Sequence, residues 1–404
     1  MRNIFVGLLA FLLVISCTEK KKEKDDWVKS DFEFATNQLT VAIQEVEKAR
    51  EVNAPDKVFP RTIATNGNLI LTNYYDWTCG FFPGELWYMY EYSKDDIWKQ
   101  HAELFTNALE GAQWDRSNHD LGFKIYCSFG NGYRLTGNEK YREVMLQAAQ
   151  TLITRYKPTV GVIRSWDFNN SVWQTPVIID NMMNLELLFW AFKETSDSTY
   201  YNIAVSHADK TMENHFRKDF SSYHVVDYDS ITSQVLNKHT HQGYAHESAW
   251  ARGQAWGAYG YTMCYGETKN PAYLQQAEEI IEFIFNNPNL PEDLIPYWDF
   301  DASGIPNEPR DVSAATIVAS ALYELSLYNI EKAELYRNRA NSILTSLSLH
   351  YKATPGGDYG FLLLHSTGHK PGNSEIDAPI VYADYYFLEA LLRKHKLETN
   401  QPLF

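Results

Sequence analysis

Cysteine is scarce in this 404-residue chain, which contains four, at positions 17, 79, 127 and 264. Cys17 lies in an apolar N-terminal segment, and the other three form an odd set whose spacing fits no metal site. The sequence therefore argues against a disulfide framework and against a cysteine-based zinc site.

Basic residues are also fewer than acidic ones. Lys and Arg total 36 against 51 Asp and Glu, so the formal net charge is -15. Binding to phosphates requires a basic stripe, which a chain of this charge lacks. Nucleic acid is therefore not expected as a partner, and an anionic substrate would have to be met by a few local cations.

Apolar runs long enough to cross a bilayer are missing after residue 27. Before that point, Arg2 precedes an apolar run over residues 4–15, and a small residue, Ser16, precedes Cys17. This pattern resembles a bacterial lipoprotein signal that is cleaved before Cys17, which would then carry the lipid. An ordinary secretory signal with an incidental cysteine is the alternative.

The segment 18–26 is highly charged and has no apolar residue, which is typical of a solvated tether. We therefore expect residues 1–26 to be a signal peptide and tether, and residues 27–404 to be a single domain. The lipid would be the only membrane anchor. The expected location is the periplasm or the outer membrane, with the chain lipid-anchored through Cys17.

Aromatic residues, by contrast, are abundant: 11 Trp, 27 Tyr and 21 Phe make up 15% of the chain. Many of these rings are expected to fill the core between helices, but aromatic faces also suit sugar rings. The composition alone leaves both interpretations open.

Strand-like alternation is nearly absent, and apolar residues instead recur with a helical period, which predicts an all-α fold. The triplets Thr-Gly-Asn at 136–138, Ser-Asp-Ser at 196–198 and Asp-Val-Ser at 311–313 contain polar residues that supply capping signals at three helix starts. The expected helices span residues 28–52, 81–94, 96–110, 122–136, 139–155, 179–194, 197–216, 247–266, 271–286, 311–328, 331–350 and 380–396.

Polar residues that open alternate helices recur at intervals of 60 to 73 residues, at Asp120, Asp180, Glu247, Asp311 and Asp384. A period of this length that holds two helices indicates a helical-hairpin repeat, and six hairpins fit the chain after the tether.

Six hairpins can form an open solenoid or close into a double ring of helices. The starts of two inner helices, at 80–84 and 253–257, are rich in Gly and aromatic residues, which favours a closed ring around a lined cavity. The Pro- and Gly-rich stretches 287–309 and 353–373 are interpreted as loops between hairpins.

In a closed ring the inner helices point one set of ends at the cavity, so the polar clusters that open them would converge there. Four clusters are expected to do so, at residues 76–80, 118–123, 179–181 and 247–256.

Asp180 is the main catalytic candidate because it stands at the mouth of an otherwise apolar helix. Helix capping explains a lone Asp at such a position about as well as catalysis does. A helix N-terminus favours the ionised form by about 0.3–1 kcal/mol, whereas burial raises a carboxyl pKa by up to about 3–5 units and a nearby Asp120 acts in the same direction. We therefore expect a carboxyl that can give and then take a proton.

His239, His241 and His246 lie close together beside Glu247, but their spacing is not that of a known metal site. We interpret this segment as a loop that lines the cavity. The chain has no G-x-S-x-G elbow, P-loop or dinucleotide fingerprint. No cofactor and no metal is expected.

Six motifs occur in order between about Asp76 and Leu392: DWTCGFFPGELW, HDLGF, IDNMMN, ESAWARGQAW, DVSAA and EIDAPIVYADYYFLEAL. Through them the chain resembles the unsaturated glucuronyl hydrolases of glycoside hydrolase family 88. The resemblance implies an (α/α)6 barrel of six helical hairpins. It also implies a sugar substrate left by polysaccharide lyases, with a C4=C5 double bond beside its carboxylate. The implied reaction is hydration of that bond, which would release the unsaturated uronic acid from the non-reducing end without displacement at the anomeric carbon.

By motif match, the resemblance makes Asp180 the acid/base that protonates C4 and then deprotonates the water that adds at C5. Asp120 would be the second essential carboxylate, which holds sugar hydroxyls and raises the pKa of Asp180.

Further matches imply substrate contacts, and Arg252 would also supply the local cation that an acidic protein needs. The loop at 365–370 occupies a place where some relatives bind substrate sulfate, so sulfated glycosaminoglycan fragments are a hypothesis. The implied substrate contacts are Trp77, His119, His224, Gln242, Arg252 and Trp256, with Ser366 and Lys370 as candidate sulfate contacts.

Two alternatives are weighed against this function. The first is a related six-hairpin hydrolase that acts on unsaturated rhamnogalacturonan disaccharides, and the HDLGF and IDNMMN motifs argue against it. The second is a non-catalytic glycan-binding lipoprotein, which would have no need of the pair Asp120 and Asp180. The sequence gives no indication of an oligomeric state.

Overall fold

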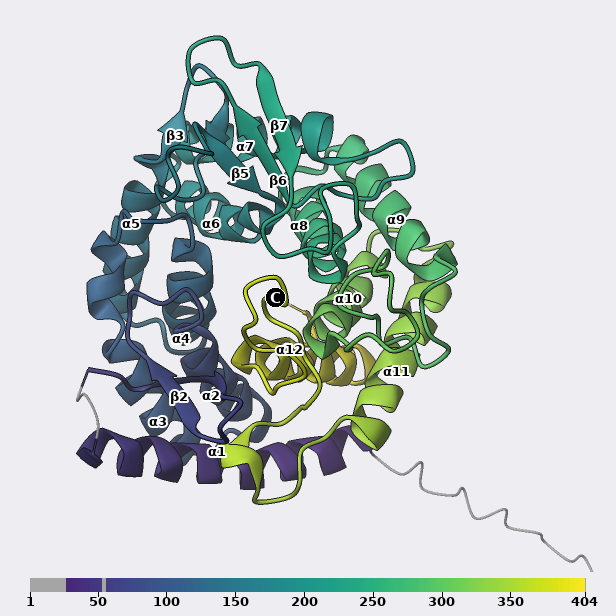
Figure 1. Ribbon diagram of the computed structural model, residues 1–404. Coiled ribbons are helices and arrows are strands. Elements are labelled where there is room, and N and C mark those ends of the chain that lie inside the picture. The colour runs from purple at the N-terminus through teal and green to yellow at the C-terminus, as the bar shows by residue number, and fades with distance from the viewer. Residues whose placement is uncertain (1–26, 53–55, 404) are drawn as a thin grey trace, which may run out of the picture.

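Within residues 27–52 and 56–403, which the computed structural model describes, the helices form two concentric rings (Figure 1). The outer ring contains α1 (Trp27–Val52), α3 (Asp96–Asn107), α5 (Glu139–Ile153), α7 (Ser198–His215), α9 (Pro271–Asn286) and α11 (Ala333–His350). The inner ring contains α2 (Phe81–Ser93), α4 (Asn131–Thr136), α6 (Leu185–Thr195), α8 (Ala251–Thr268), α10 (Val312–Leu325) and α12 (Val381–Glu398). Two irregular helices belong to the inner ring as well: η2 (Gly122–Gly130), a π-helix, leads into α4, and η3 (Ile179–Asn184), a 3-10 helix, leads into α6.

The inner ring closes because each of its helices packs against the next and α12 returns to α2. The inner helix α10 is buried along its whole length, whereas the outer helix α9 buries one face only. A helix that is hydrophobic all round needs neighbours on every side, and a one-sided helix needs only one layer beneath it. The expected closed ring, an (α/α)6 barrel, is confirmed.

The predicted helix boundaries are close to the observed ones, and three of the predicted caps are present. Asn138, Asp197 and Asp311 each accept a backbone N–H with the side chain at the start of a helix. One predicted start is wrong: α8 begins at Ala251 and not at 247, because residues 247–250 belong to the preceding loop.

The prediction of almost no strand missed seven short antiparallel strands within the described residues. They are two to five residues long, which is too short for alternation to stand out in sequence. They form a hairpin of β1 (Phe59–Ile63) and β2 (Leu69–Thr72), a second pair of β3 (Tyr156–Lys157) and β4 (Val162–Ile163), and a three-stranded sheet of β5 (Pro176–Ile178), β6 (Val225–Tyr228) and β7 (Val235–His239). Two further short 3-10 helices are η1 (Glu110–Trp114) and η4 (Asp358–Gly360).

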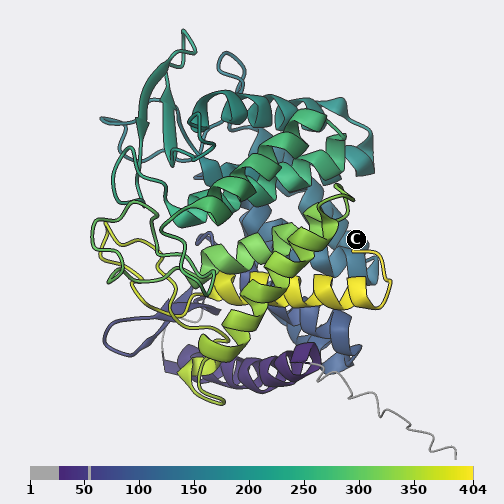
Figure 2. The same cartoon turned by 90° about the vertical axis from the view of Figure 1, so that its right-hand side faces the viewer.

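The two ends of the barrel differ. Long loops and the three-stranded sheet gather at one end, on the left of Figure 2, whereas α12 ends at the opposite side, where the C-terminus lies. Four aromatic rings from four inner helices cross the middle of the barrel. Phe81 contacts Phe123 (5.6 Å between centroids), which contacts Trp256 (5.1 Å), which contacts Tyr386 (5.5 Å), and Tyr386 returns to Phe81 (6.0 Å). These four contacting rings are called the aromatic layer below.

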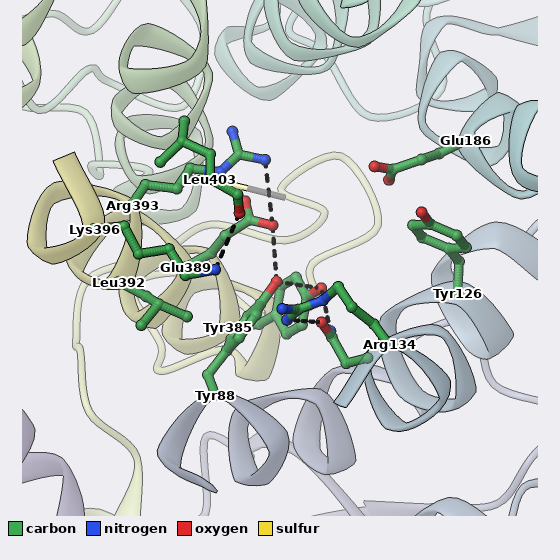
Figure 3. Close-up of a pocket in the computed structure, with 11 residues that line it drawn as sticks. Tyr88, Tyr126, Arg134, Glu186, Tyr385, Glu389, Leu392, Arg393, Lys396 and Leu403 are labelled. Atoms are coloured by element: carbon green, nitrogen blue, oxygen red, sulfur yellow. Dashed lines mark hydrogen bonds and ion pairs between the residues drawn. The ribbon is translucent and has the colours of Figure 1, made fainter. Parts of the chain in front are cut away.

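A cavity of about 110 Å³ is lined by residues of five inner-ring helices (α2, η2, α4, α6 and α12) and by Leu403, near the C-terminus (Figure 3). On one side of this far-end cavity, Glu389 accepts hydrogen bonds from Tyr88 (2.8 Å) and Tyr259 (3.2 Å). Glu186 and Tyr126 lie on the other side. Burial, with the nearby Glu389 as a further cause, raises the pKa of the Glu186 carboxyl to about 8.

Cys79, Cys127 and Cys264 are buried and have free thiols. Among residues 27–52 and 56–403, no helix is both long and apolar enough to span a membrane. The predicted lipid-bearing Cys17 and its tether lie outside the described residues.

Candidate active site

A cavity of about 570 Å³ lies at the loop-rich end of the barrel, where the N-terminal ends of the inner helices meet the loops. Five of the residues predicted from the sequence line it: Trp77, His119, Asp120, Asp180 and Gln242. The polar residues that open separate inner helices therefore do converge, as the closed ring requires.

Asp180 is the second residue of η3 and follows β5, so the end of a strand aims it at the cavity. Burial raises the pKa of its carboxyl from 3.8 to about 6, and the nearby charge of Asp120 acts in the same direction. His119 and Arg252 act in the opposite direction. Near neutral pH a fraction of Asp180 is therefore protonated and can donate a proton.

Asp120 lies in the turn before η2. The side chain of Asn118 accepts the N–H of Asp120 at 3.0 Å, which fixes the turn. The buried ring of His119 places Nε2 3.1 Å from Asp120 Oδ1. Asp120 is thus held at the cavity wall by its two preceding neighbours.

His224 lies behind Asp180 and is itself buried, so it does not line the cavity. Its Nδ1 accepts the backbone N–H groups of His241 and Gln242, both at 3.0 Å. Two donors on Nδ1 place the proton of the neutral ring on Nε2, the atom that faces Asp180. Burial lowers the pKa of His224 well below its usual range, so the ring stays neutral.

Two loops meet at the cavity rim. Gln242 donates from Nε2 to the carbonyl of Gly368 at 3.1 Å, and the His369 ring lies 2.9 Å from the carbonyl of His241. Because Gln242, His241 and His369 all line the cavity, this contact fixes one side of its opening.

Besides His224, four of the predicted substrate contacts do not line the cavity. Trp256 and Ser366 are fully buried, the first within the aromatic layer and the second beside the backbone of Ser313. Arg252 is also fully buried and Lys370 is paired with Glu308. A direct contact of these four with substrate stays a prediction.

Arg252 instead joins structural elements beneath the rim. Its guanidinium pairs with Asp311 at 2.5 Å and donates to the carbonyls of Thr367 (2.7 Å) and Gly368 (2.5 Å). The arginine therefore holds the 365–370 loop against the start of α10.

The other three acidic residues of the repeat, Asp311, Asp384 and Glu247, do not line the cavity. Asp311 caps α10, and Asp384 accepts the backbone N–H groups of Leu362 and Leu363. The side chain of Glu247 is 74% exposed, so the fourth predicted cluster does not turn its carboxylate toward the cavity.

Arg61 is a cavity residue that the sequence did not reveal. It comes from β1, and among the described lining residues its guanidinium is the one permanent cation. Glu375 accepts from Nε (2.6 Å) and Nη2 (3.1 Å), and Asp76 accepts from Nη1 (2.6 Å). No motif contains Arg61, because its partner Glu375 lies more than 300 positions away in the chain.

The cavity rim also carries an aromatic pair that sequence analysis did not single out. Trp166 and Phe168 stack with centroids 4.9 Å apart and planes 14° apart, and both line the cavity. Phe168 is 48% exposed, so a flat apolar face is available to a ligand. The high aromatic content was the one sequence feature that pointed to such a surface.

The histidine segment divides in two. His241 lines the cavity, whereas His239 and His246 stack on each other with centroids 4.1 Å apart. Across the described part of the chain, no group of three or more His, Cys, Asp or Glu side chains is placed to hold a metal ion.

This arrangement suits proton transfer to a small polar ligand with a ring face. A carboxyl of raised pKa and a second carboxylate share the wall, while Trp77, Phe123 and Trp166 supply aromatic faces. The cavity volume is in the range of small-molecule sites.

The chain was compared with protein families, curated proteins and solved structures. No family model matches it. An unsaturated glucuronyl hydrolase of Formosa agariphila is 52% identical over 324 residues, which cover 80% of each chain. An unsaturated chondroitin disaccharide hydrolase of Streptococcus pneumoniae is 35% identical over 332 residues, 80% of this chain and 82% of the relative. The crystal structure of an unsaturated glucuronyl hydrolase specific for heparin superposes with a TM-score of 0.88 at 48% identity and covers 93% of this chain and 98% of the other.

Proposed function

The chain belongs to the unsaturated glucuronyl hydrolases, and from this premise we propose which of its residues carry the reaction and which substrate it takes. The enzyme removes the 4,5-unsaturated uronic acid from the non-reducing end of oligosaccharides that polysaccharide lyases leave. One observation carries the assignment of roles: the buried carboxyl of Asp180 lies in the cavity beside Asp120 and has a pKa raised to about 6.

We assign both proton transfers to Asp180. Its carboxylic acid gives a proton to C4, and the electron pair of the C4=C5 bond forms the new C–H bond, which leaves positive charge shared between C5 and the ring oxygen. The carboxylate then takes a proton from water as the water oxygen bonds to C5. The resulting hemiketal opens to a ketone at C5, and the hemiacetal at C1 releases the next sugar.

Asp120 has a different role in this proposal. Its carboxylate accepts hydrogen bonds from sugar hydroxyls, and its charge favours the protonated form of Asp180 before the first step. His119 holds Asp120 in place, and the aromatic side chains Trp77 and Trp166 pack against the sugar.

Arg61 is proposed to bind the acidic group of the substrate. A guanidinium has five N–H groups, and Glu375 and Asp76 take three, so one remains on each Nη nitrogen. The two carboxylates hold the group rigid at the cavity wall. A planar pair of donors suits a carboxylate or a sulfate.

For the substrate class we propose unsaturated disaccharides from glycosaminoglycans, and among them those derived from heparin. The support is the relation to the heparin-specific enzyme, which is 48% identical, against 35% for the chondroitin disaccharide hydrolase. The sulfate contacts predicted at Ser366 and Lys370 are not part of this proposal, because Ser366 is fully buried and Lys370 binds Glu308.

The test is a panel of lyase-generated disaccharides from heparin, chondroitin, hyaluronan and rhamnogalacturonan. Loss of the ultraviolet absorbance of the double bond reports hydration. The heparin disaccharides are expected to give the highest kcat/KM, and Asp180→Asn is expected to bind substrate without turnover. Turnover by Asp180→Asn at the parent rate would refute the acid/base role, and a preference for rhamnogalacturonan would refute the substrate class.

We also propose that residues 1–26 are a lipoprotein signal and tether, that residues 27–404 are the catalytic domain and that Cys17 carries a lipid in the periplasm or at the outer membrane. The support is the apolar run at residues 4–15 followed by Ser16, Cys17 and a charged segment. Mass spectrometry of the N-terminal peptide from membranes tests this, and an unmodified Cys17 in the mature chain would contradict it.

A further inference from the structure

The two carboxylates of the cavity are carried by different elements, so something must set the distance between them. Asp120 stands just before η2, and Asp180 stands in η3. Asp180 is buried and Asp120 is half-buried, so when both are ionised their mutual repulsion favours a wider separation than a neutral pair would adopt.

Asn184 connects the two elements on the C-terminal side of the carboxylates. It is the last residue of η3, one turn beyond Asp180, and it is fully buried. Its Oδ1 accepts the backbone N–H of Phe123, three residues beyond Asp120, at 3.1 Å. A carbonyl oxygen is the only part of this amide that can accept a hydrogen bond, so the orientation of the side chain is fixed.

The backbone near this contact leaves no room for adjustment. A Cβ atom built on Gly122 would lie 2.5 Å from Cα of Asn184 and 2.7 Å from its Oδ1. The first turn of η2 therefore lies directly against the last turn of η3, and any larger residue at position 122 would force them apart.

Ser165 connects the two segments on the N-terminal side of the carboxylates. Its carbonyl accepts the N–H of His119, next to Asp120, at 3.0 Å. Its Oγ accepts the N–H of Ile178, two residues before Asp180, also at 3.0 Å. Ser165 is fully buried in the wall of the cavity that it helps to line, so both bonds are shielded from water.

We propose that Ser165 and Asn184 are positioning residues that clamp the segments carrying Asp120 and Asp180 and so set the separation of the two carboxylates. This inference rests on the proposed roles of the two aspartates. The clamp acts at two points, one on each side of the carboxylates along the chain, so that neither segment can pivot away from the other. Loosening it lets the two like charges move apart, which weakens the effect of Asp120 on Asp180 and displaces the acid from C4.

The test uses Asn184→Leu, which keeps the size of the side chain and removes the acceptor, and Ser165→Ala, which removes only Oγ. In each variant kcat, KM and the pH dependence of kcat/KM are measured with one unsaturated disaccharide. The expected result is a fall in kcat of about ten- to hundredfold with a much smaller change in KM. The alkaline limb of the pH profile is expected to move to lower pH, because Asp180 loses part of the charge effect that favours its protonated form.

Thr151→Val is the matched control. Thr151 is buried in α5 and does not line the cavity. Its hydroxyl donates to the carbonyls of Gln113 (2.7 Å) and Gln147 (3.0 Å) and accepts from Gln147 Nε2 (3.2 Å), so this variant also loses buried hydrogen bonding. It is expected to lower Tm as the clamp variants do while keeping the parent pH profile. Clamp variants that lose stability but keep the parent kcat and alkaline limb would overturn the proposal.

The clamp and the proposed function can be tested separately. Where Asn184→Leu does not fold, Ser165→Ala decides alone, since it removes one acceptor and leaves the backbone intact. The parent enzyme and Asp180→Asn test the proposed function separately. An inactive parent refutes that function, whereas an active parent with unshifted clamp variants refutes only the clamp.

Discussion

His224 Nε2 lies 3.6 Å from Asp180 Oδ2, and among the described residues neither atom has a hydrogen-bond partner. The N–H groups that bind Nδ1 of His224 place its proton on the side of Asp180. The ring is therefore a neutral donor that is ready for the carboxylate form of Asp180. In the proposed mechanism that carboxylate forms after the first proton transfer.

The first prediction concerns this pair. An N–H aimed at a carboxylate oxygen favours the ionised form, so His224→Phe is expected to raise the pKa of Asp180. The alkaline limb of kcat/KM should then move to higher pH, opposite to the shift expected for Asn184→Leu. Because the N–H groups of His241 and Gln242 lose their acceptor, KM should rise as well. An unchanged alkaline limb would show that His224 has no electrostatic influence on Asp180.

The second prediction is a gain of stability in an inactive variant. The pKa of Asp180 is raised from 3.8 to about 6 in the folded protein, so the folded state binds this proton more tightly than the unfolded state does. The free energy of unfolding therefore falls as pH rises from about 4 to about 6, by at most roughly 3 kcal/mol. Asp180→Asn cannot ionise, so its free energy of unfolding should not fall in this way. Its Tm is expected to exceed that of the parent at pH 8 and to match it near pH 3.5, and equal Tm values at pH 8 would contradict the raised pKa.

The third prediction applies the same test at the far-end cavity, where no chemistry is proposed. Burial raises the pKa of Glu186 to about 8, with Glu389 as the next cause, so the folded state loses stability between pH 4.5 and 8. Glu186→Gln is expected to raise Tm at pH 8 and to leave kcat and KM unchanged, because Glu186 lines the far-end cavity and is not among the residues that line the active-site cavity. A change in kcat would show that the two cavities are coupled.

Local sequence predicted the elements of this fold well, because helix periods and caps are local signals. Asp197 and Asp311 cap helices where they were expected to. The repeat of acidic helix starts also placed Asp120 and Asp180 in one cavity, since inner helices of a closed ring all point the same way.

Pairings between distant segments could not be predicted in this way. Arg61 meets Glu375 across the closed ring. Glu375 opens one of the six motifs, but Arg61 lies in none of them, and nothing in the motif indicates that the two residues pair. Arg252 was expected at the substrate because its motif is close to the cavity, but the fold turns its guanidinium to Asp311 and to loop carbonyls. Motif position shows that a residue lies near the site, whereas only the packing of the loops shows which way its side chain points.

The last prediction separates charge from geometry at Arg61. Its side chain is 23% exposed and bound by Glu375 and Asp76, so a substitution affects both the substrate and the rim. Arg61→Lys keeps the charge but loses the planar pair of donors, and Arg61→Gln loses both. If the guanidinium binds the acidic group of the substrate, Arg61→Gln should raise KM by about ten- to hundredfold. This is the usual cost of losing one charged hydrogen bond, about 1.5–3 kcal/mol. The KM of Arg61→Lys should lie between that of Arg61→Gln and that of the parent.

Glu375→Gln is the control, because it loosens the same arginine from the rim and leaves its charge in the cavity. The substrate methyl ester, which lacks the carboxylate charge, should bind Arg61→Gln and the parent about equally. A KM that rises equally for the ester and the acid would show that Arg61 only supports the rim.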